Sequence, residues 1–159
     1  MFERRRIERT GSGEIRVRLA REERALVRSV VESVRKRLDD DPDDVGLRRL
    51  FPPAHAHDAE AEREYRDLVH DGLLEGHRRA LTLVEETLDR DRLTPEQAEA
   101  WLGALNDVRL VLGTLLDVTE ETYAAELDEH DPRDRELAVF AYLSWLQEQL
   151  VEALAPGVD

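Results

Sequence analysis

The stretch WLGALNDVRLVLG, residues 101–113, sets three polar side chains, Asn106, Asp107 and Arg109, into an otherwise apolar helix. Buried polar groups cost free energy unless they are hydrogen-bonded, so these three side chains either form a satisfied network between helices or line a binding site. At 3.6 residues per turn, Asn106 and Arg109 share one face, and Asp107 points about 100° away from Asn106. The pattern therefore predicts a helix whose polar cluster faces its neighbours.

Partners for this cluster are expected in the last helix, where Gln147 and Glu148 follow an apolar run. An ion pair of Arg109 with Glu148 or Asp107, with hydrogen bonds from Gln147 and Asn106, would fix the register of the two helices. Native buried polar groups are usually satisfied within the fold, so we favour this internal network over a ligand site.

Hydrophobic periodicity predicts four main helices. They cover residues 21–39, 58–89, 94–117 and 131–155. The third has a strong start signal in Thr94-Pro95-Glu96-Gln97, and the fourth begins with Asp131-Pro132. The run LAVFAYLSWL, residues 137–146, is apolar on nearly every face, which predicts that the last helix is the central one of the bundle.

The second helix is expected to bury a stripe along its whole length. Its members would be Ala61, Tyr65, Leu68, Gly72, Leu73, Gly76, Ala80, Leu83 and Leu88, and the two glycines would permit a close approach of another helix. Before it, Pro52 and Pro53 exclude a regular helix over residues 45–57, where Phe51 is expected to reach the core. A polar segment at 119–127 is expected to form a further helical turn.

The N-terminus carries a hairpin signature. Residues 2–9 and 14–19 flank Thr10-Gly11-Ser12-Gly13, and Ile15, Val17 and Leu19 alternate with charged side chains. The expected fold is therefore all-α with a small β-hairpin: one domain over residues 1–159, with the hairpin at 1–19 packed on the outside of a helical bundle at 20–155. That bundle would hold four main helices and one or two short ones.

Charge and composition narrow the function classes. The 159 residues carry a net charge of −14, but residues 1–37 hold 12 Lys and Arg against 6 Asp and Glu, whereas the remainder holds 11 against 31. An acidic body repels phosphate backbones and anionic lipids, so only the basic head could meet nucleic acid. The longest uncharged run has 11 residues, too short to cross a bilayer, and no secretory signal is visible, so we expect a cytoplasmic protein.

Catalytic motifs are missing from the sequence. The chain has no cysteine, its single lysine lies in no phosphate-binding loop, and its four serines lie in no GxSxG turn. We therefore expect a protein that is not an enzyme, and no cofactor is implied. The favoured hypothesis is a protein-interaction or adaptor module with an unknown protein partner, and its oppositely charged faces would also suit a homo-oligomer.

Two alternatives remain open. A nucleic-acid-binding transcriptional regulator would use the basic hairpin residues Arg4, Arg5, Arg6, Arg9, Arg16 and Arg18. We favour the interpretation that these charges only keep an exposed edge strand from pairing with another strand. A metal- or small-ligand-binding protein would use His55, His57, His70 or His77, with Asp67 three residues before His70. Only one acid-x-x-His pair is present, whereas a carboxylate-bridged di-iron bundle needs two, so we expect surface histidines and no metal.

Several blocks of residues resemble the DUF2017 family, actinobacterial proteins of unknown function. The matching positions are Leu50-Phe51-Pro52-Pro53-Ala54, Trp101-Leu102, Leu105-Asn106-Asp107, Arg109-Leu110, Leu112-Gly113, Trp145-Leu146-Gln147-Glu148 and Leu150. The resemblance implies a cytoplasmic bacterial protein without an assigned reaction or cofactor. Two positions depart from the family pattern: His55 replaces an expected tyrosine and Leu115 an expected arginine, which argues against a second buried guanidinium.

Overall fold

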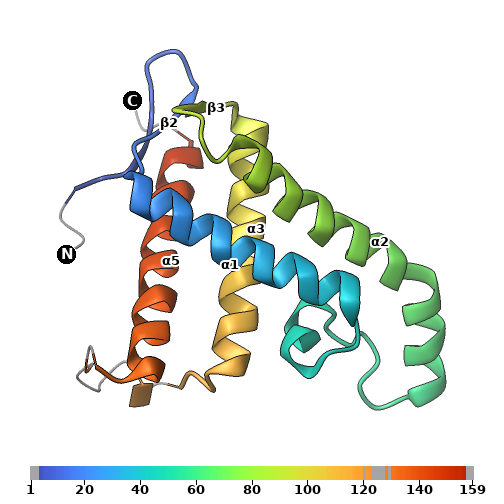
Figure 1. Ribbon diagram of the computed structural model, residues 1–159. Coiled ribbons are helices and arrows are strands. Elements are labelled where there is room, and N and C mark those ends of the chain that lie inside the picture. The colour runs from blue at the N-terminus through green and yellow to red at the C-terminus, as the bar shows by residue number, and fades with distance from the viewer. Residues whose placement is uncertain (1–3, 120, 123–127, 129, 157–159) are drawn as a thin grey trace.

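The computed structural model describes residues 4–119, 121–122, 128 and 130–156. The expected all-α fold with a small β-hairpin is confirmed. Four long helices, α1 (Arg21–Asp40), α2 (Ala59–Thr87), α3 (Pro95–Leu115) and α5 (Pro132–Leu154), are joined by short connections and a small sheet (Figure 1). Most of the polar segment 119–127, where a helical turn was expected, lies outside the described residues.

The helix starts follow the capping signals. Thr94 and Gln97 form a reciprocal capping box at the start of α3, where the Thr94 hydroxyl accepts from the Gln97 amide. The Asp58 side chain accepts two amide hydrogen bonds at the start of α2, and Asp131 accepts one at the start of α5. Each cap satisfies backbone donors that the first helical turn leaves unpaired.

The central helix is α3, which corrects the expectation that the last helix would be central. α3 packs against α5, α2, α1 and the 3-10 helix η1 (Val45–Leu50), while α5 packs mainly against α3 and β1. In Figure 1, α3 and α5 run antiparallel side by side, α1 crosses both, and α2 has its C-terminal end beside α3 while the rest of it extends away from α5. α3 can take neighbours on several sides because it buries small residues, Ala98, Ala104 and Gly113, among its large ones. None of the helices over the described ranges combines the length and apolar composition needed to cross a bilayer.

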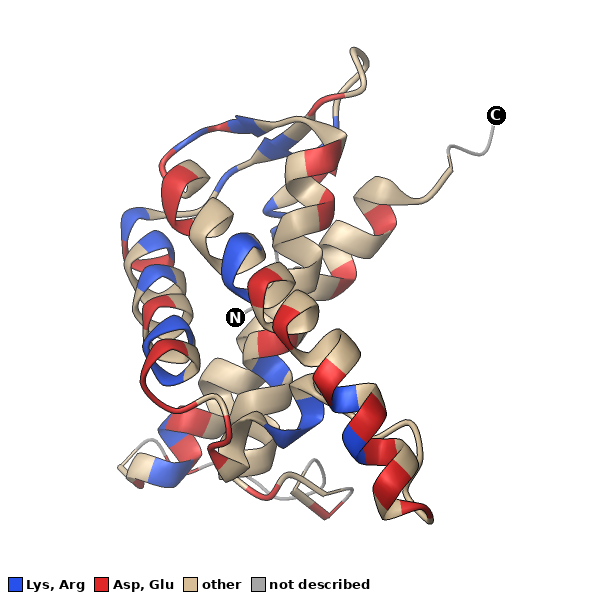
Figure 2. Ribbon diagram, turned by 90° about the vertical axis from the view of Figure 1, so that its right-hand side faces the viewer, with Lys and Arg blue, Asp and Glu red and all other residues tan. Residues whose placement is uncertain are grey.

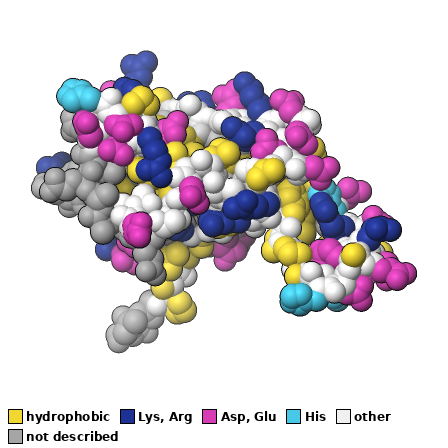
Figure 3. All heavy atoms as spheres, turned by 90° about the horizontal axis from the view of Figure 1, so that it is seen from below, with side chains coloured by type: hydrophobic (Ala, Val, Ile, Leu, Met, Phe, Trp, Pro, Cys, Tyr) yellow, Lys and Arg dark blue, Asp and Glu magenta, His cyan; other side chains and the backbone are white. Residues whose placement is uncertain are grey.

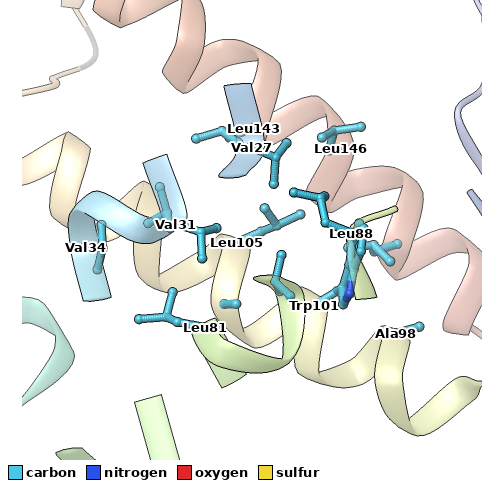
Figure 4. Close-up of a cluster of buried hydrophobic side chains, with 14 of the residues drawn as sticks. Val27, Val31, Val34, Leu81, Leu88, Ala98, Trp101, Leu105, Leu143 and Leu146 are labelled. Atoms are coloured by element: carbon cyan, nitrogen blue, oxygen red, sulfur yellow. The ribbon is translucent and has the colours of Figure 1, made fainter. Parts of the chain in front are cut away.

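The hydrophobic core lies where these helices meet. Figure 4 shows Val27 and Val31 of α1, Leu105 of α3 and Leu143 of α5 pointing toward one another. Burying each such side chain contributes about 1.5–3 kcal/mol relative to exposure. The buried Trp101 indole Nε1 donates to the Thr87 hydroxyl at 2.7 Å, so the largest core side chain leaves no polar atom unpaired.

The sheet has three antiparallel strands in the order β1-β2-β3: β1 (Ile7–Arg9), β2 (Ile15–Val17) and β3 (Arg92–Leu93). The hairpin was expected; the third strand, which follows α2, was not. Ile15 pairs with Leu93, and both side chains are buried. The sheet is thereby tied to the loop between α2 and α3 as well as to α5.

The first three-quarters of α2 depart from the expected stripe. None of residues 59–80, here named the α2 arm, is buried, and the Leu68 side chain is 84% exposed. The buried positions of α2 are Leu81, Val84 and Thr87, and of the arm only Leu74 and Ala80 pack, partly buried, against the hydrophobic core. A Cβ added at Gly72 or Gly76 would meet nothing within 4 Å, so these glycines do not mediate a close helix approach. In Figure 1 the α2 arm changes direction and extends away from the body.

Candidate functional site

The α2 arm and η1 enclose a large hollow. This open cleft has a volume of about 1050 Å³ and is lined by Arg48 and Val45 on one side and by Arg63, Arg66 and His70 on the other. Arg66 reaches across it to Asp43 at 3.5 Å. Seen from below, the arm stands apart from the body and carries histidine, acidic and basic side chains together (Figure 3). η1 corrects the prediction from Pro52 and Pro53 that residues 45–57 hold no regular helix, because both prolines lie after η1 ends.

The base of the arm is joined to the body through His77. Its Nδ1 lies 2.7 Å from the Asp107 carboxylate of α3, and its Nε2 donates to the Leu50 carbonyl of η1 at 2.9 Å. The Asp107 residue is only 6% exposed. One imidazole therefore holds three elements together.

The environment of His77 favours its charged form. The hydrogen bond that His77 donates to Asp107 raises the pKa of His77 above 6.5, helped by the Asp107 charge and the Leu50 carbonyl, while partial burial opposes the shift. With both nitrogens protonated, each ring nitrogen donates to an oxygen. His77 is then a structural cation, with no nitrogen lone pair left for a metal.

The other predicted histidine ligands are not assembled either. His70 stacks on Phe51 with ring centroids 4.7 Å apart, and His77 meets the same ring edge-on at 5.5 Å. Phe51 thus packs at the base of the arm, against the core as expected. His55 packs against Tyr65 and His57 is exposed. Over the described residues, no group of three or more His, Asp or Glu is placed to hold a metal ion.

The polar cluster of α3 divides between two neighbours. Asp107 faces α2, whereas Asn106 and Arg109 face α5, as the helical angle between them requires. Arg109 Nη1 donates to Gln147 Oε1, and Gln147 Nε2 donates to Asn106 Oδ1 at 3.4 Å. These hydrogen bonds form the expected link between α3 and α5.

The expected ion pair of Arg109 is wrong. Among the described residues, neither Asp107 nor Glu148 lies within ion-pair distance of Arg109: Asp107 pairs with His77, and Glu148 is exposed. Arg109 lies instead over the Phe140 ring, with its guanidinium carbon 5.5 Å from the centroid. Sequence reasoning missed His77 as the partner of Asp107, and it missed Arg49 of η1, which reaches Gly113 beside Arg109. A glycine four residues after a half-buried arginine is the signal that could have indicated such an approach.

The arginines of the hairpin are mostly paired with acids. Arg16 and Arg18 both contact Glu8, at 3.9 and 3.2 Å, and Arg6 pairs with Glu23 at 2.9 Å. Arg5 pairs with Glu152 of α5 at 2.8 Å, which leaves Arg4 and Arg9 without an ion pair to any described residue. In Figure 2 blue and red segments alternate along the hairpin and α1 instead of forming a basic stripe. Charged side chains at a sheet edge prevent pairing with a strand of another chain, and this arrangement fits that role better than phosphate binding.

A buried cluster connects the hairpin to α5. The Tyr142 hydroxyl donates to Glu23 at 2.6 Å, and the Glu23 carboxylate also accepts from Arg6 and from the Ala20 amide. Burial opposes ionisation of Glu23, but these hydrogen bonds together lower its pKa. Burial and the Glu23 carboxylate raise the pKa of Tyr142 far above its usual value. Tyr142 therefore stays protonated as a structural donor, which suits packing and does not suit proton abstraction.

Comparison with known proteins gives one family. The family model described as "Domain of unknown function (DUF2017)" matches residues 4–154. The chain belongs to the DUF2017 family. Within the matched region lie both sides of the cleft, His77, and the α3 cluster.

A relative with a described role is found in Mycobacterium leprae. It is named "Putative oxidative stress regulator AosR" and is 29% identical over 130 residues, which make up 71% of this chain and 59% of that protein. The chain thus spans about three fifths of the length of this relative. No solved structure matches the chain.

The two departures from the family pattern have structural counterparts. His55 is exposed beside Tyr65, so an aromatic ring from α2 lies next to the position where the tyrosine was expected. Leu115 covers the backbone of Gly46 in η1. The second guanidinium near Arg109 is supplied by Arg49, from another segment of this DUF2017 chain.

Proposed function

We propose that this chain is a non-enzymatic regulatory module that acts by binding another protein through the α2 arm. The observation that carries the proposal is the incomplete burial of the arm: none of residues 59–80 is buried, and Leu68 is exposed. Helices in water gain most of their stability from packing an apolar face against other elements. A helical arm that leaves Leu68 84% exposed gains that packing when a partner covers it.

The charge of the arm defines the partner. Residues 58–71 hold six Asp and Glu against two Arg, so a nucleic acid or an anionic membrane would be repelled. The complementary surface is a protein segment with basic side chains around an apolar one that covers Leu68. Val45, 70% exposed on the facing side of the cleft, offers a second apolar contact.

A regulatory role also agrees with the name of the Mycobacterium leprae relative. The chain contains no cysteine, so a response to oxidants through a thiol of these 159 residues is excluded. Regulation by protein contact requires no such group.

The test places a photo-crosslinking amino acid at position 68 in native cells. The control position is 151 on α5, where Val151 is also exposed, at 51%, outside the cleft. We expect one protein to be crosslinked from position 68 and not from 151. The purified partner should then bind the Leu68→Ser variant at least about tenfold more weakly than the wild type, with Val151→Ser unchanged.

Charge reversal provides the second criterion. Glu64→Arg on the arm should weaken binding of the same partner more at low salt than at high salt. Equal crosslinking from both positions, or affinity unaffected by Leu68→Ser, would refute the proposal. A crosslink to a second copy of the chain would refute the heterologous partner and identify self-association through the arm.

A further inference from the structure

A smaller hollow lies at the C-terminal half of α3, apart from the α2 arm. Its volume is about 360 Å³, the size of small-molecule sites, and its walls come from α3, α5, η1 and the segment after α3. Leu110, Val118 and Phe140 provide apolar surface. Arg49 and Arg109 provide the charge, and none of the lining residues is acidic.

Arg109 has a hydrogen-bond donor that no described protein group accepts. Its Nη1 donates to Gln147, but its Nε is buried and has no hydrogen-bond partner in the described protein. Every other described arginine that lacks a carboxylate partner is exposed, whereas Arg109 is half-buried. A partly desolvated guanidinium without a counter-charge is costly, so an anion at this place would lower the free energy of the protein.

Arg49 adds a second cation to the same hollow. Its Nη1 lies 3.5 Å from the point where a Cβ of Gly113 would be, so the glycine leaves room for Arg49 against α3. Among the described residues, Arg49 has neither an ion pair nor a hydrogen bond from its side chain. The chain has a net charge of −14, yet this hollow is lined by two guanidinium groups and by no acidic side chain. Two such groups can form charge-assisted hydrogen bonds to an anion.

Arg109 also lines a second hollow, of about 330 Å³, together with Ser144, Gln147, Glu148 and Glu152. Its two carboxylates would repel an anion. Of the two hollows that Arg109 lines, the one that contains Arg49 is therefore the better site for an anion.

We propose that the hollow between Arg49, Arg109 and Phe140 binds the anionic group of a small molecule, a carboxylate or a phosphate. The guanidinium groups pair with the anion, and an apolar part of the ligand packs against Phe140 and Leu110. A bound ligand would bridge η1, α3 and α5. No residue of the α2 arm lines this hollow.

The test uses benzoate and phenyl phosphate as probes, with benzylamine as the cationic control. The buried Nε–H of Arg109 is a direct reporter in ¹H–¹⁵N spectra, assigned from the loss of its signal in Arg109→Lys. We expect a saturable shift of this signal with benzoate, phenyl phosphate or both, and none with benzylamine. The probe that binds more tightly separates a carboxylate ligand from a phosphate ligand.

Arg49→Gln is the decisive variant, because Arg49 is exposed and its replacement leaves the core intact. Losing one charge-assisted pair should weaken the anion about tenfold or more. Arg28→Gln removes the same charge from an exposed pair with Asp89 on α1 and should leave the affinity unchanged. No saturable shift with either anion up to about 10 mM, or an equal effect of the two variants, would overturn the site. Neither result would bear on crosslinking from position 68.

Discussion

The pair of His77 and Asp107 shows how one side chain can control a whole segment. The imidazole ties the base of the α2 arm to α3 and, through Leu50, to η1. Because Asp107 is buried and accepts from a cation, the interaction exceeds that of an ordinary surface ion pair. Protonation of this one residue therefore strengthens the attachment of the arm to α3 and η1.

Stability should accordingly fall as pH rises. The pKa of His77 is raised above 6.5 in the folded protein, so the folded state holds this proton more tightly than the unfolded state. The stabilisation is fully present below about pH 6.5 and is lost as pH rises through the higher folded value. Urea unfolding across this interval measures the slope.

The Asp107→Asn variant distinguishes the pH dependence caused by this pair from that caused by other titrating groups. The amide keeps a hydrogen-bond acceptor but removes the charge, so we expect a loss of about 1–2 kcal/mol at low pH and a flatter pH profile. His57→Gln, at an exposed histidine, should leave both unchanged. A slope that survives in Asp107→Asn would show that other groups cause it.

At the residue scale, sequence reasoning predicted which side chains matter better than it predicted their partners. The helical angle correctly separated Asp107 from Asn106 and Arg109, and Gln147 was correctly named as a partner. His77 and Arg49 were not, because periodicity defines a face of one helix and does not say which neighbour covers that face. Partner identity depends on how α2 and η1 dock on α3.

Among the elements, the α2 arm is the one whose sequence pattern is misleading. Ala61, Tyr65 and Leu68 repeat at helical spacing, as a buried stripe would, yet none of them is buried. Under the proposed function this stripe contacts a protein partner, and periodicity alone does not distinguish a core from an interface. β3 was missed for a different reason: two residues, Arg92–Leu93, are too few to show alternation.

Glycine substitutions test whether the arm is free. A Cβ at Gly72 or Gly76 would meet nothing within 4 Å, so alanine there costs no packing and lowers the entropy of the unfolded chain. We expect each of Gly72→Ala and Gly76→Ala to stabilise the protein by about 0.5–1 kcal/mol and to raise helicity by circular dichroism.

Gly46→Ala is the matched control in η1. Its Cβ would lie 2.9 Å from the Leu115 side chain and 3.0 Å from the capping oxygen of Asp44, so we expect a loss of about 1 kcal/mol or more. Destabilisation by Gly72→Ala or Gly76→Ala instead would mean that another surface already covers the arm.

For the molecule as a whole, the uneven charge of the sequence becomes internal complementarity. Arg28 of the basic head pairs with Asp89, which follows α2, and Arg35 pairs with Glu85, near the C-terminal end of α2. Figure 2 shows basic segments of α1 and the sheet interspersed with acidic ones. The composition correctly predicted two oppositely charged regions. It could not predict that residues of the two regions pair with one another, because the pairing depends on how α1 lies on α2.

This arrangement predicts that the basic hairpin does not bind nucleic acid. Phosphate binding draws its free energy from released counterions, and arginines already paired with carboxylates release few. Four of the six candidate arginines, Arg5, Arg6, Arg16 and Arg18, are paired in this way. We expect no saturable shift of labelled duplex DNA at about 150 mM salt.

Glu8→Gln tests the reason for this expectation. It frees Arg16 and Arg18 together and should produce weak binding that disappears as salt rises, because each new phosphate contact adds about one unit to the salt slope. Wild-type binding with a steep salt slope would show instead that DNA competes successfully with Glu8 for both guanidinium groups. The hairpin, and not the α2 arm, would then be the surface through which the chain acts.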